Sequence, residues 1–480
     1  MKKVWITTAL FFIIIFIAWF LVIQLGQKHI APNKAREIIT SPIQPSTTHK
    51  QYWSMNGKNI MLLGGSVEDN LFQYKNIEEH LDLLKSVGGN YVRNTMSSRD
   101  EGDVWAFAKN EEELYDLRIW NDEYWNRFEN FLKACAEREI IVQIELWATF
   151  DFYRENWDVN PFNPKNNINY SPELVRIPTE VKSHPTWTEN NFFWSVPNQE
   201  SNLRLLDYQQ KFIDKLLSYS LKFNNILYCM DNETSVTSEW GKFWSLYIKK
   251  VASEQSHKIY TTEMWDPWSL DHVAHRETFD HPEVYDFVDI SQNNHNVGDV
   301  HWNNGLEQIR RLQKNNMLRP LNNVKVYGND GGRHKTTQNA IESFVRNLMF
   351  GAASTRFHRP TSGQGLNVIS QHVIKSMRSY VDQSDFFNAT PSNHLLSERT
   401  ENEAFCRAIE GKEYAIFFPN GGEVQLKIII ENEKIQIKWL DILKSEWKGE
   451  SMIAIHNSKA TITAPDQKNW LAFLNIKNHK

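Results

Sequence analysis

Three consecutive polar residues, Asp231, Asn232 and Glu233, follow directly on the apolar run "YCM". Asp and Asn are common turn residues, but turn formation does not explain the glutamate. A further acid, Asp330, stands before two glycines in "YGNDGG". Two carboxyl groups that face each other can donate a proton and attack or deprotonate a second group, and this is the chemistry that Glu233 and Asp330 predict. The turn sequence "NDGG" leaves a purely structural role for Asp330 open.

Short apolar strands alternate with amphipathic helices around these acids. Strands are predicted at 59–65, 90–95, 140–147, 225–230, 258–265, 286–294, 323–329 and 353–358. Repeated strand–helix units form parallel sheets. We predict an α/β fold, a closed (β/α)₈ TIM barrel over residues 51–390. An open doubly wound sheet is the alternative, but "GGSVEDN" after the first strand is not a glycine-rich phosphate loop.

The two ends of the chain differ from the barrel. Residues 1–27 carry Lys2 and Lys3 and then no charge, which predicts an uncleaved transmembrane signal anchor. Residues 28–50 are polar and rich in Pro, Ser and Thr, as a tether would be. We therefore expect a single-pass cell-membrane protein whose globular part is extracytoplasmic, either periplasmic or at the cell surface. Alternating apolar and polar residues over 391–480 predict a small β-sandwich domain.

The composition excludes several classes of protein. The net charge of −5 gives no electrostatic case for binding nucleic acid. Only three cysteines occur, without metal-ligand spacing, so we expect no metal, no cofactor and no disulfide framework. The 18 Trp, 16 Tyr and 27 Phe residues indicate either large cores or a cleft lined with rings that stack on sugars.

Polar and aromatic residues gather at the predicted strand ends. In a parallel barrel the carboxyl ends of the strands face the active site. The candidates there are Arg93, Glu145, Trp147, Asn232, Glu233, Glu263, Trp265, Asn294, His295, Tyr327, Asp330, Arg356 and His358. Carboxylates dominate this set, which suits glycoside hydrolysis: one acid protonates the leaving oxygen, and the other attacks the anomeric carbon or activates water. Strands four and seven face each other across the barrel mouth, so Glu233 and Asp330 form the predicted catalytic pair.

Asn232-Glu233 at the end of strand four, with Arg93 at the end of strand two, resembles the pattern of clan A glycoside hydrolases. The C-terminal segment "YAIFFPNGGEVQL" is similar to the β-domain of cellulase-like and apiosidase-like barrels. The resemblance implies a carbohydrate substrate, with Glu233 as acid/base and Asn232 as ligand of the hydroxyl beside the anomeric carbon. Arg93 would then position the nucleophile.

One departure from the clan concerns strand seven, where the resemblance implies a glutamate and this chain offers Asp330. Retaining enzymes hold their two carboxyl groups about 5–5.5 Å apart, and inverting enzymes about 6.5–9.5 Å apart. An inverting mechanism therefore remains open, as does the use of Glu145 or Glu263 as the second acid. The departure also leaves open a barrel that binds glycans on the cell surface without cleaving them.

The other candidates each have a structural alternative. Glu145 and Glu263 either accept hydrogen bonds from sugar hydroxyls or pair with Arg93 inside the barrel. Trp147 and Trp265 either stack on sugar or cap the barrel. The aromatic residues of the long loop 148–203 either wall a cleft or pack that loop onto the barrel.

Strands six to eight carry the remaining candidates. Asn294 and His295 stand where the clan keeps a polar or aromatic partner, although a hydrogen-bonded structural histidine is the alternative. Tyr327 is expected to contact substrate. Arg356, His358 and Arg359 could hold an anionic sugar such as a uronate, since arginine forks match carboxylates, or could form a salt-bridged loop.

Overall fold

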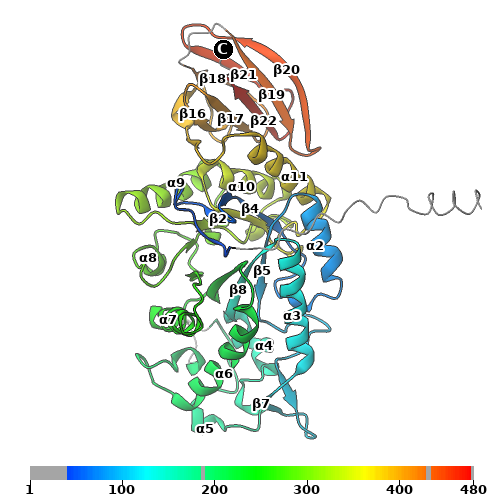
Figure 1. Ribbon diagram of the computed structural model, residues 1–480, viewed down its shortest axis with the longest axis vertical. Coiled ribbons are helices and arrows are strands. Elements are labelled where there is room, and N and C mark those ends of the chain that lie inside the picture. Colours follow the sequence, from blue (N-terminus) through cyan, green and yellow to red (C-terminus); the bar gives the residue numbers. More distant parts are fainter. Residues whose placement is uncertain (1–40, 185–189, 429–433, 477–480) are drawn as a thin grey trace, which may run out of the picture. The chain divides into compact units, whose positions relative to one another are not determined.

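Eight parallel strands form the centre of the computed structural model, which describes residues 41–184, 190–428 and 434–476 (Figure 1). The strands are β4 (Leu62–Gly65), β5 (Tyr91–Thr95), β8 (Ile141–Ala148), β9 (Ile226–Asn232), β10 (Thr261–Thr262), β11 (Val288–Asp289), β12 (Leu321–Asn322) and β13 (Ser354–Phe357). Six of them pair in the order β10-β9-β8-β5-β4-β13, and β11 pairs with β12. Backbone bonds from Asp286 N to Thr261 O and from Val326 N to Arg356 O, both 2.8 Å, join the two sets into a barrel.

A helix follows each barrel strand, as the predicted (β/α)₈ pattern requires. These helices are α2 (Ile77–Ser86), α3 (Asp122–Glu137), α6 (Leu203–Ser220), α7 (Ser238–Glu254), α8 (Val273–Phe279), α9 (Gly298–Lys314), α10 (Thr337–Phe350) and α11 (Val368–Gln383). A hairpin of β6 (Phe107–Lys109) and β7 (Tyr115–Trp120) follows β5, and the short helices α4 (Arg154–Val159) and α5 (Pro172–Val175) lie in the long loop after β8. The barrel that the sequence predicts is thus confirmed, although strands five to seven are shorter than expected.

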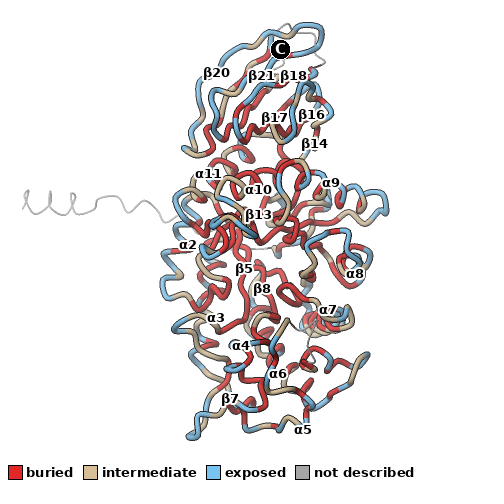
Figure 2. Tube along the Cα trace, turned by 180° about the vertical axis from the view of Figure 1, so that it is seen from behind, coloured by how far each residue is buried: buried red, intermediate tan, exposed pale blue. Residues whose placement is uncertain are grey.

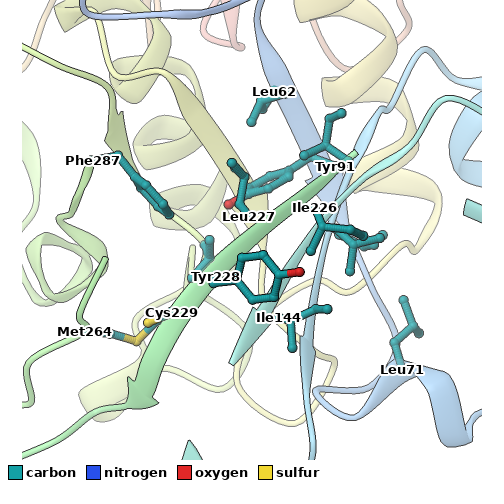
Figure 3. Close-up of a cluster of buried hydrophobic side chains, with 14 of the residues drawn as sticks. Leu62, Leu71, Tyr91, Ile144, Ile226, Leu227, Tyr228, Cys229, Met264 and Phe287 are labelled. Atoms are coloured by element: carbon teal, nitrogen blue, oxygen red, sulfur yellow. The ribbon is translucent and has the colours of Figure 1, made fainter. Parts of the chain in front are cut away.

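Side chains of β9 alternate between the inside and the outside of the barrel. Tyr228 and Leu227 leave the strand on opposite sides (Figure 3). The Tyr228 hydroxyl donates to Ser220 Oγ of α6 at 2.8 Å, so Tyr228 faces the helix layer. Leu227 therefore faces inward, and the same period of two decides which side chains reach the mouth of the barrel.

A small antiparallel sheet closes the amino end of the barrel. It consists of β1 (Gln44–Pro45), β2 (Trp53–Met55) and β3 (Lys58–Ile60). Trp53 is fully buried; its Nε1 donates to Asn322 Oδ1 at 2.9 Å, and its ring meets Tyr260 and Phe287 edge to face. Residues 41–50 belong to this folded part, where Ile43 is buried, and this corrects the predicted tether 28–50 over those ten residues.

The predicted anchor, residues 1–27, and the first part of the tether lie outside the described residues. Within the described ranges, no helix is both long and apolar enough to cross a membrane.

Replacing Trp53 by Ala is expected to lower the free energy of unfolding by about 3–5 kcal/mol, because the substitution leaves a cavity among the rings at the closed end of the barrel. Chemical denaturation followed by circular dichroism measures this loss. Trp194→Ala, at a side chain that is 39% exposed, is the matched control and should cost less than about 1 kcal/mol. Equal losses in the two variants would contradict this view of Trp53.

The C-terminal region is an antiparallel β-sandwich. One sheet has the order β14-β16-β17-β22-β19-β20, and the other has the order β15-β18-β21. The strands are β14 (Thr390–Pro391), β15 (Leu396–Ser397), β16 (Phe405–Ile409), β17 (Glu413–Phe418), β18 (Glu423–Lys427), β19 (Lys434–Asp441), β20 (Glu446–Ala454), β21 (Lys459–Thr463) and β22 (Trp470–Asn475). Its own core includes Ile416, Val424, Leu426, Ile462 and Leu474. The expected β-domain is therefore present.

The larger sheet also shares a core with the barrel. Phe405, Phe417 and Phe473 belong to the same buried cluster as the barrel strands. Helix α10 is buried from Ala340 to Phe350, and β17 is buried along its whole length (Figure 2). Arg407, fully buried on β16, donates to the Tyr52 hydroxyl at 2.6 Å. The two domains are therefore joined by an apolar contact and not by a solvated linker.

Candidate active site

A cavity of about 280 Å³ lies at the carboxyl end of the barrel strands, where parallel barrels place their ligand sites. The lining residues are Asp69, Arg93, Arg99, Phe150, Asn232, Glu233, Lys325, Tyr327, Arg333, His334, His358, Arg359, Thr361 and Ser362. Five of the predicted residues are brought together here: Arg93, Asn232, Glu233, Tyr327 and His358. This cavity is the candidate active site.

Glu233 lies one residue beyond β9 and is only 8% exposed. Its backbone φ of 58° lies in the left-handed region, which is unfavourable for a glutamate. The carboxylate oxygen Oε1 lies 2.7 Å from Lys325 Nζ. The same oxygen accepts hydrogen bonds from the Tyr327 hydroxyl at 3.2 Å and from Gln292 Nε2 at 3.3 Å. Three donors from strands six and seven thus fix this carboxylate in the cavity wall.

The charge state of Glu233 follows from these neighbours. Burial alone would raise the pKa of the carboxyl group, but the Lys325 ammonium and the Arg93 guanidinium together offset burial, and the pKa falls to about 2. Glu233 is therefore ionised at every ordinary pH. An ionised carboxylate suits a nucleophile or a base. The resemblance to clan A instead implies that Glu233 is an acid/base, a group that must also carry a proton.

Asp69 gathers the cations on the opposite side of the cavity. Its carboxylate lies 2.7 Å from Arg93 Nη1, 3.0 Å from Arg99 Nη2, 3.3 Å from Arg359 Nε and 3.2 Å from His358 Nε2. Burial opposes ionisation, but Arg93 and then His358 bring the pKa of Asp69 well below its usual range. This residue connects the ends of strands one, two and eight, and it orients the guanidinium groups that line the cavity.

The structure decides between the alternatives for two of the predicted acids, Glu145 and Glu263. Its Nε donates to Glu145 Oε1 at 2.6 Å, and both side chains are fully buried below the cavity. Glu263 Oε1 instead accepts from the backbone nitrogens of Asp231 at 2.9 Å and Met264 at 3.0 Å. Neither Glu145 nor Glu263 lines the cavity, and both hold the barrel interior together.

Strand seven presents a cation and a phenol to Glu233. Lys325 and Tyr327 are two residues apart, so their side chains leave the chain on the same side. Lys325 Nζ also donates to Asn232 Oδ1 at 2.5 Å. Asp330 lies farther along, with a side chain that is 53% exposed and 3.3 Å from His334 Nδ1, and it is not among the lining residues. The predicted pairing of Glu233 with Asp330 is therefore not formed in this cavity, because the Asp330 side chain lies on an exposed part of the loop after Tyr327.

The aromatic residues at the ends of strands three and five are buried in packing contacts. Trp147 is 3% exposed and lies against Phe192, Trp240 and Trp244. Trp265 is equally buried, and its Nε1 donates to Thr278 Oγ1 at 2.7 Å. Neither ring lines the cavity, so both cap the barrel as the structural alternative states.

The long loop after β8 is held in place by Asp231, for which turn chemistry was the only expectation. Asp231 Oδ1 accepts from Thr149 N at 2.9 Å and from Thr149 Oγ1 at 2.8 Å. Trp157, Phe192 and Phe193 are fully buried beneath the loop. These contacts fold the loop onto the barrel, and of the loop residues that the structure describes, Phe150 alone reaches the cavity lining.

The segments that follow strands five and six place an aromatic pair near the site. The His295 ring stacks on Trp268 with centroids 3.9 Å apart, and it meets the Tyr327 ring at 5.6 Å. Burial lowers the pKa of His295 to about 4, so the ring is neutral. Trp268 is 55% exposed and therefore offers a free ring face at the edge of the site. Asn294, by contrast, is buried and donates to Ser291 O at 2.6 Å.

Two of the residues predicted at the end of strand eight, Arg356 and His358, lie in different places. Arg356 is fully buried and donates to Val324 O at 2.6 Å and to Ser66, so it stays inside the barrel. His358 lines the cavity and contacts Ser362 Oγ through Nδ1 at 2.6 Å. Burial lowers the pKa of His358 to about 3 despite its contact with Asp69, so this imidazole is neutral.

Sequence reasoning missed several residues of the site, namely Asp69, Arg99, Lys325, Arg333 and Trp268. Lys325 carried a usable signal, because it shares the parity of Tyr327 on the same strand. The others lie in loops after the strands, where the sequence shows no period that would fix the direction of a side chain.

Comparison with known proteins bears on the fold. No protein-family model and no curated protein match the chain. A solved glycoside hydrolase of family 5 from Bacteroides vulgatus is similar over 91% of this chain and 93% of its own, with a TM-score of 0.60 and 12% identity. Another glycoside hydrolase is similar over 92% of this chain and 98% of its own, with a TM-score of 0.61 and 10% identity. A putative glycoside hydrolase from Bacteroides vulgatus follows, over 91% of this chain and 82% of its own, with a TM-score of 0.57 and 12% identity.

These similarities extend through both the barrel and the C-terminal region. At such low identity they establish the fold alone, a TIM barrel with the architecture of clan A glycoside hydrolases. The fold that the sequence resemblance implies is thereby confirmed.

Proposed function

We propose that this protein hydrolyses O-glycosidic bonds of a poly- or oligosaccharide and that Glu233 is its essential carboxylate. The observation that carries the proposal is the position of Glu233: a buried, ionised carboxylate at the end of strand four, held in a strained backbone by Lys325 and Tyr327. A buried carboxylate that its neighbours keep ionised can stabilise a positively charged transition state.

In the proposed reaction, Glu233 acts on the anomeric carbon. Glycoside hydrolysis passes through an oxocarbenium-like transition state, and an ionised carboxylate either attacks this carbon or activates water beside it. The bond between the anomeric carbon and the leaving oxygen breaks as that oxygen takes up a proton. Lys325 keeps Glu233 ionised, and Trp268 offers the exposed ring on which a sugar can stack.

The proton donor that fits best is Asp266. Its backbone nitrogen donates to Thr234 O at 2.9 Å, which places the residue beside the Glu233 segment. Burial, followed by the charge of Glu233, raises the pKa of Asp266, so it retains a proton more readily than an ordinary aspartate. Together Glu233 and Asp266 would supply one ionised and one protonated carboxyl group, which is the combination that the reaction needs.

A second candidate function is glycan binding without cleavage. Strand seven favours it, because Lys325 contacts Glu233 where the clan resemblance implies a second glutamate. Such a protein would keep the ring face of Trp268 and the polar cavity but perform no turnover.

Incubation of the full-length protein with a panel of neutral and acidic polysaccharides separates the two functions. Hydrolysis predicts release of new reducing ends from at least one polysaccharide, in proportion to enzyme and time. Saturable binding without any release, across the whole panel and from pH 4 to 8, would overturn the hydrolase and leave the binding protein.

A further inference from the structure

Arginine side chains from three separate loops surround the mouth of the cavity. Arg99 follows β5, Arg333 follows β12 and Arg359 follows β13, and all three line the cavity. Arg93 and Lys325 lie deeper in the same cavity. Because the whole chain carries a net charge of −5, this concentration of cations is a local feature and not a consequence of composition.

The acids that line the cavity do not neutralise these three arginine side chains. In the deeper part, Glu233 pairs with Lys325, while Arg93 is shared between Asp69 and Glu145. Arg99 and Arg359 both contact Asp69, a carboxylate that Arg93 already engages.

Two acids at the rim of the cavity lie near Arg359. Arg333, by contrast, has no acid beside it among the described residues. Arg359 Nη1 lies 3.5 Å from Asp100 and 3.7 Å from Glu68. Burial and the neighbouring Asp100 raise the pKa of Glu68 to about 7, so its negative charge is incomplete at neutral pH. Arg333 donates to His334 Nε2 at 3.1 Å, and in the described part of the chain it pairs with no carboxylate.

Buried guanidinium groups in the cavity also keep unused hydrogen-bond donors. Arg93 is fully buried, yet among the described residues its Nη2 has no acceptor. Arg99 Nε is likewise buried without an acceptor in that part of the chain, on a side chain that is 10% exposed. Unsatisfied buried donors cost free energy, and a bound ligand with acceptor oxygens would satisfy them.

We propose that the cavity recognises a sugar residue that carries an anionic oxygen group, either a carboxylate or a sulfate ester, through Arg99, Arg333 and Arg359. The proposal rests on the proposed function only in that the ligand is a sugar. Neutral sugars need amides, carboxylates and aromatic rings, whereas planar guanidinium forks match the paired oxygens of an anion. The three arginines belong to different loops, so packing of a single loop does not explain their convergence.

Binding to matched charged and neutral sugars tests this proposal. Isothermal titration of the full-length protein would use oligogalacturonate against its methyl ester, and a sulfated oligosaccharide against its desulfated form. In one of the two pairs, we expect the charged member to bind at least about tenfold more tightly at low salt, with a preference that shrinks as ionic strength rises. The pair that shows the preference distinguishes a carboxylate ligand from a sulfate ligand.

Substitutions locate the effect. Arg333→Gln and Arg359→Gln should each weaken binding of the charged member about fivefold to tenfold while leaving any binding of the neutral member unchanged. Arg118→Gln is the matched control, because Arg118 is an exposed arginine that pairs with Asp116 outside the cavity, and it should change neither affinity. Equal affinity for charged and neutral members, or no effect of the two cavity variants, would overturn the proposal.

The outcome is independent of the hydrolysis assay. Tight binding of an anionic sugar without cleavage would support this inference and contradict the hydrolase. Cleavage of neutral glycans, together with equal binding of charged and neutral sugars, would support the hydrolase and contradict this inference. Absence of binding to every probe would overturn the inference even if some polysaccharide of the panel were cleaved.

Discussion

Glu233→Gln is expected to lower kcat/KM by about 10³-fold or more while the fold is retained. The amide has nearly the same shape as the carboxylate and can still accept a hydrogen bond from Tyr327. It cannot carry the negative charge that the proposed reaction requires at the anomeric carbon. Initial rates of reducing-end release, on whichever polysaccharide is cleaved, measure the loss.

Two controls separate chemistry from stability in this experiment. Glu233→Gln leaves the Lys325 ammonium buried without its counter-ion, so Glu233→Gln/Lys325→Met should regain stability but not activity. Asp330→Asn makes the same chemical change at an exposed carboxylate outside the cavity, and it should retain activity within about twofold. If Asp330→Asn were inactive and Glu233→Gln were active, the original pairing on strand seven would have to be restored and the role of Glu233 abandoned.

Lys325→Met is expected to destabilise the protein by about 3–5 kcal/mol at neutral pH, because it removes one partner of a buried ion pair. The pKa of Glu233 is lowered from its usual 4.5 to about 2 in the folded state. The wild-type pair therefore contributes stability above pH 4.5, and this contribution is lost as the pH falls towards 2. Without Lys325, burial raises the pKa of Glu233 instead, and the sign reverses: stability is then lost as the pH rises.

Urea unfolding at pH 3, 5 and 7 checks both the size and the sign of this effect. The difference between wild type and Lys325→Met should be small at pH 3 and should grow towards pH 7. The acid limb of the pH–rate profile should also move upward in the variant, since Glu233 would ionise later. A difference that does not change with pH would show that Lys325 acts through packing and not through its charge.

The barrel could be predicted from the sequence because strands and helices alternate along its whole length. Residues 225–230 were expected as strand four, and β9 runs from Ile226 to Asn232. That prediction placed Asn232 and Glu233 correctly at the mouth of the barrel, because the strand is long and its side chains alternate clearly between the two sides. Over β12 the regular strand is only two residues long, so the direction of Lys325 depends on tertiary contacts.

The errors in the site have a common physical origin. Trp147 and Trp265 stand at strand ends, but the loops above them fold back and bury both rings, and the sequence does not reveal where a loop packs. Asp330 was assigned by its distance along the chain from strand seven. In the structure Asp330 is exposed on the loop after Tyr327, whereas Arg333 and His334 of the same loop line the cavity, and no local pattern in the sequence distinguishes these positions.

The apolar contact between the β-sandwich and the barrel has a consequence for truncated forms of the protein. Phe405, Phe417 and Phe473 complete a core that continues into the barrel, and Arg407 spans the contact. Removal of the sandwich would expose apolar surface that is now buried on α10, so a chain cut before β14 should also lose stability in its barrel.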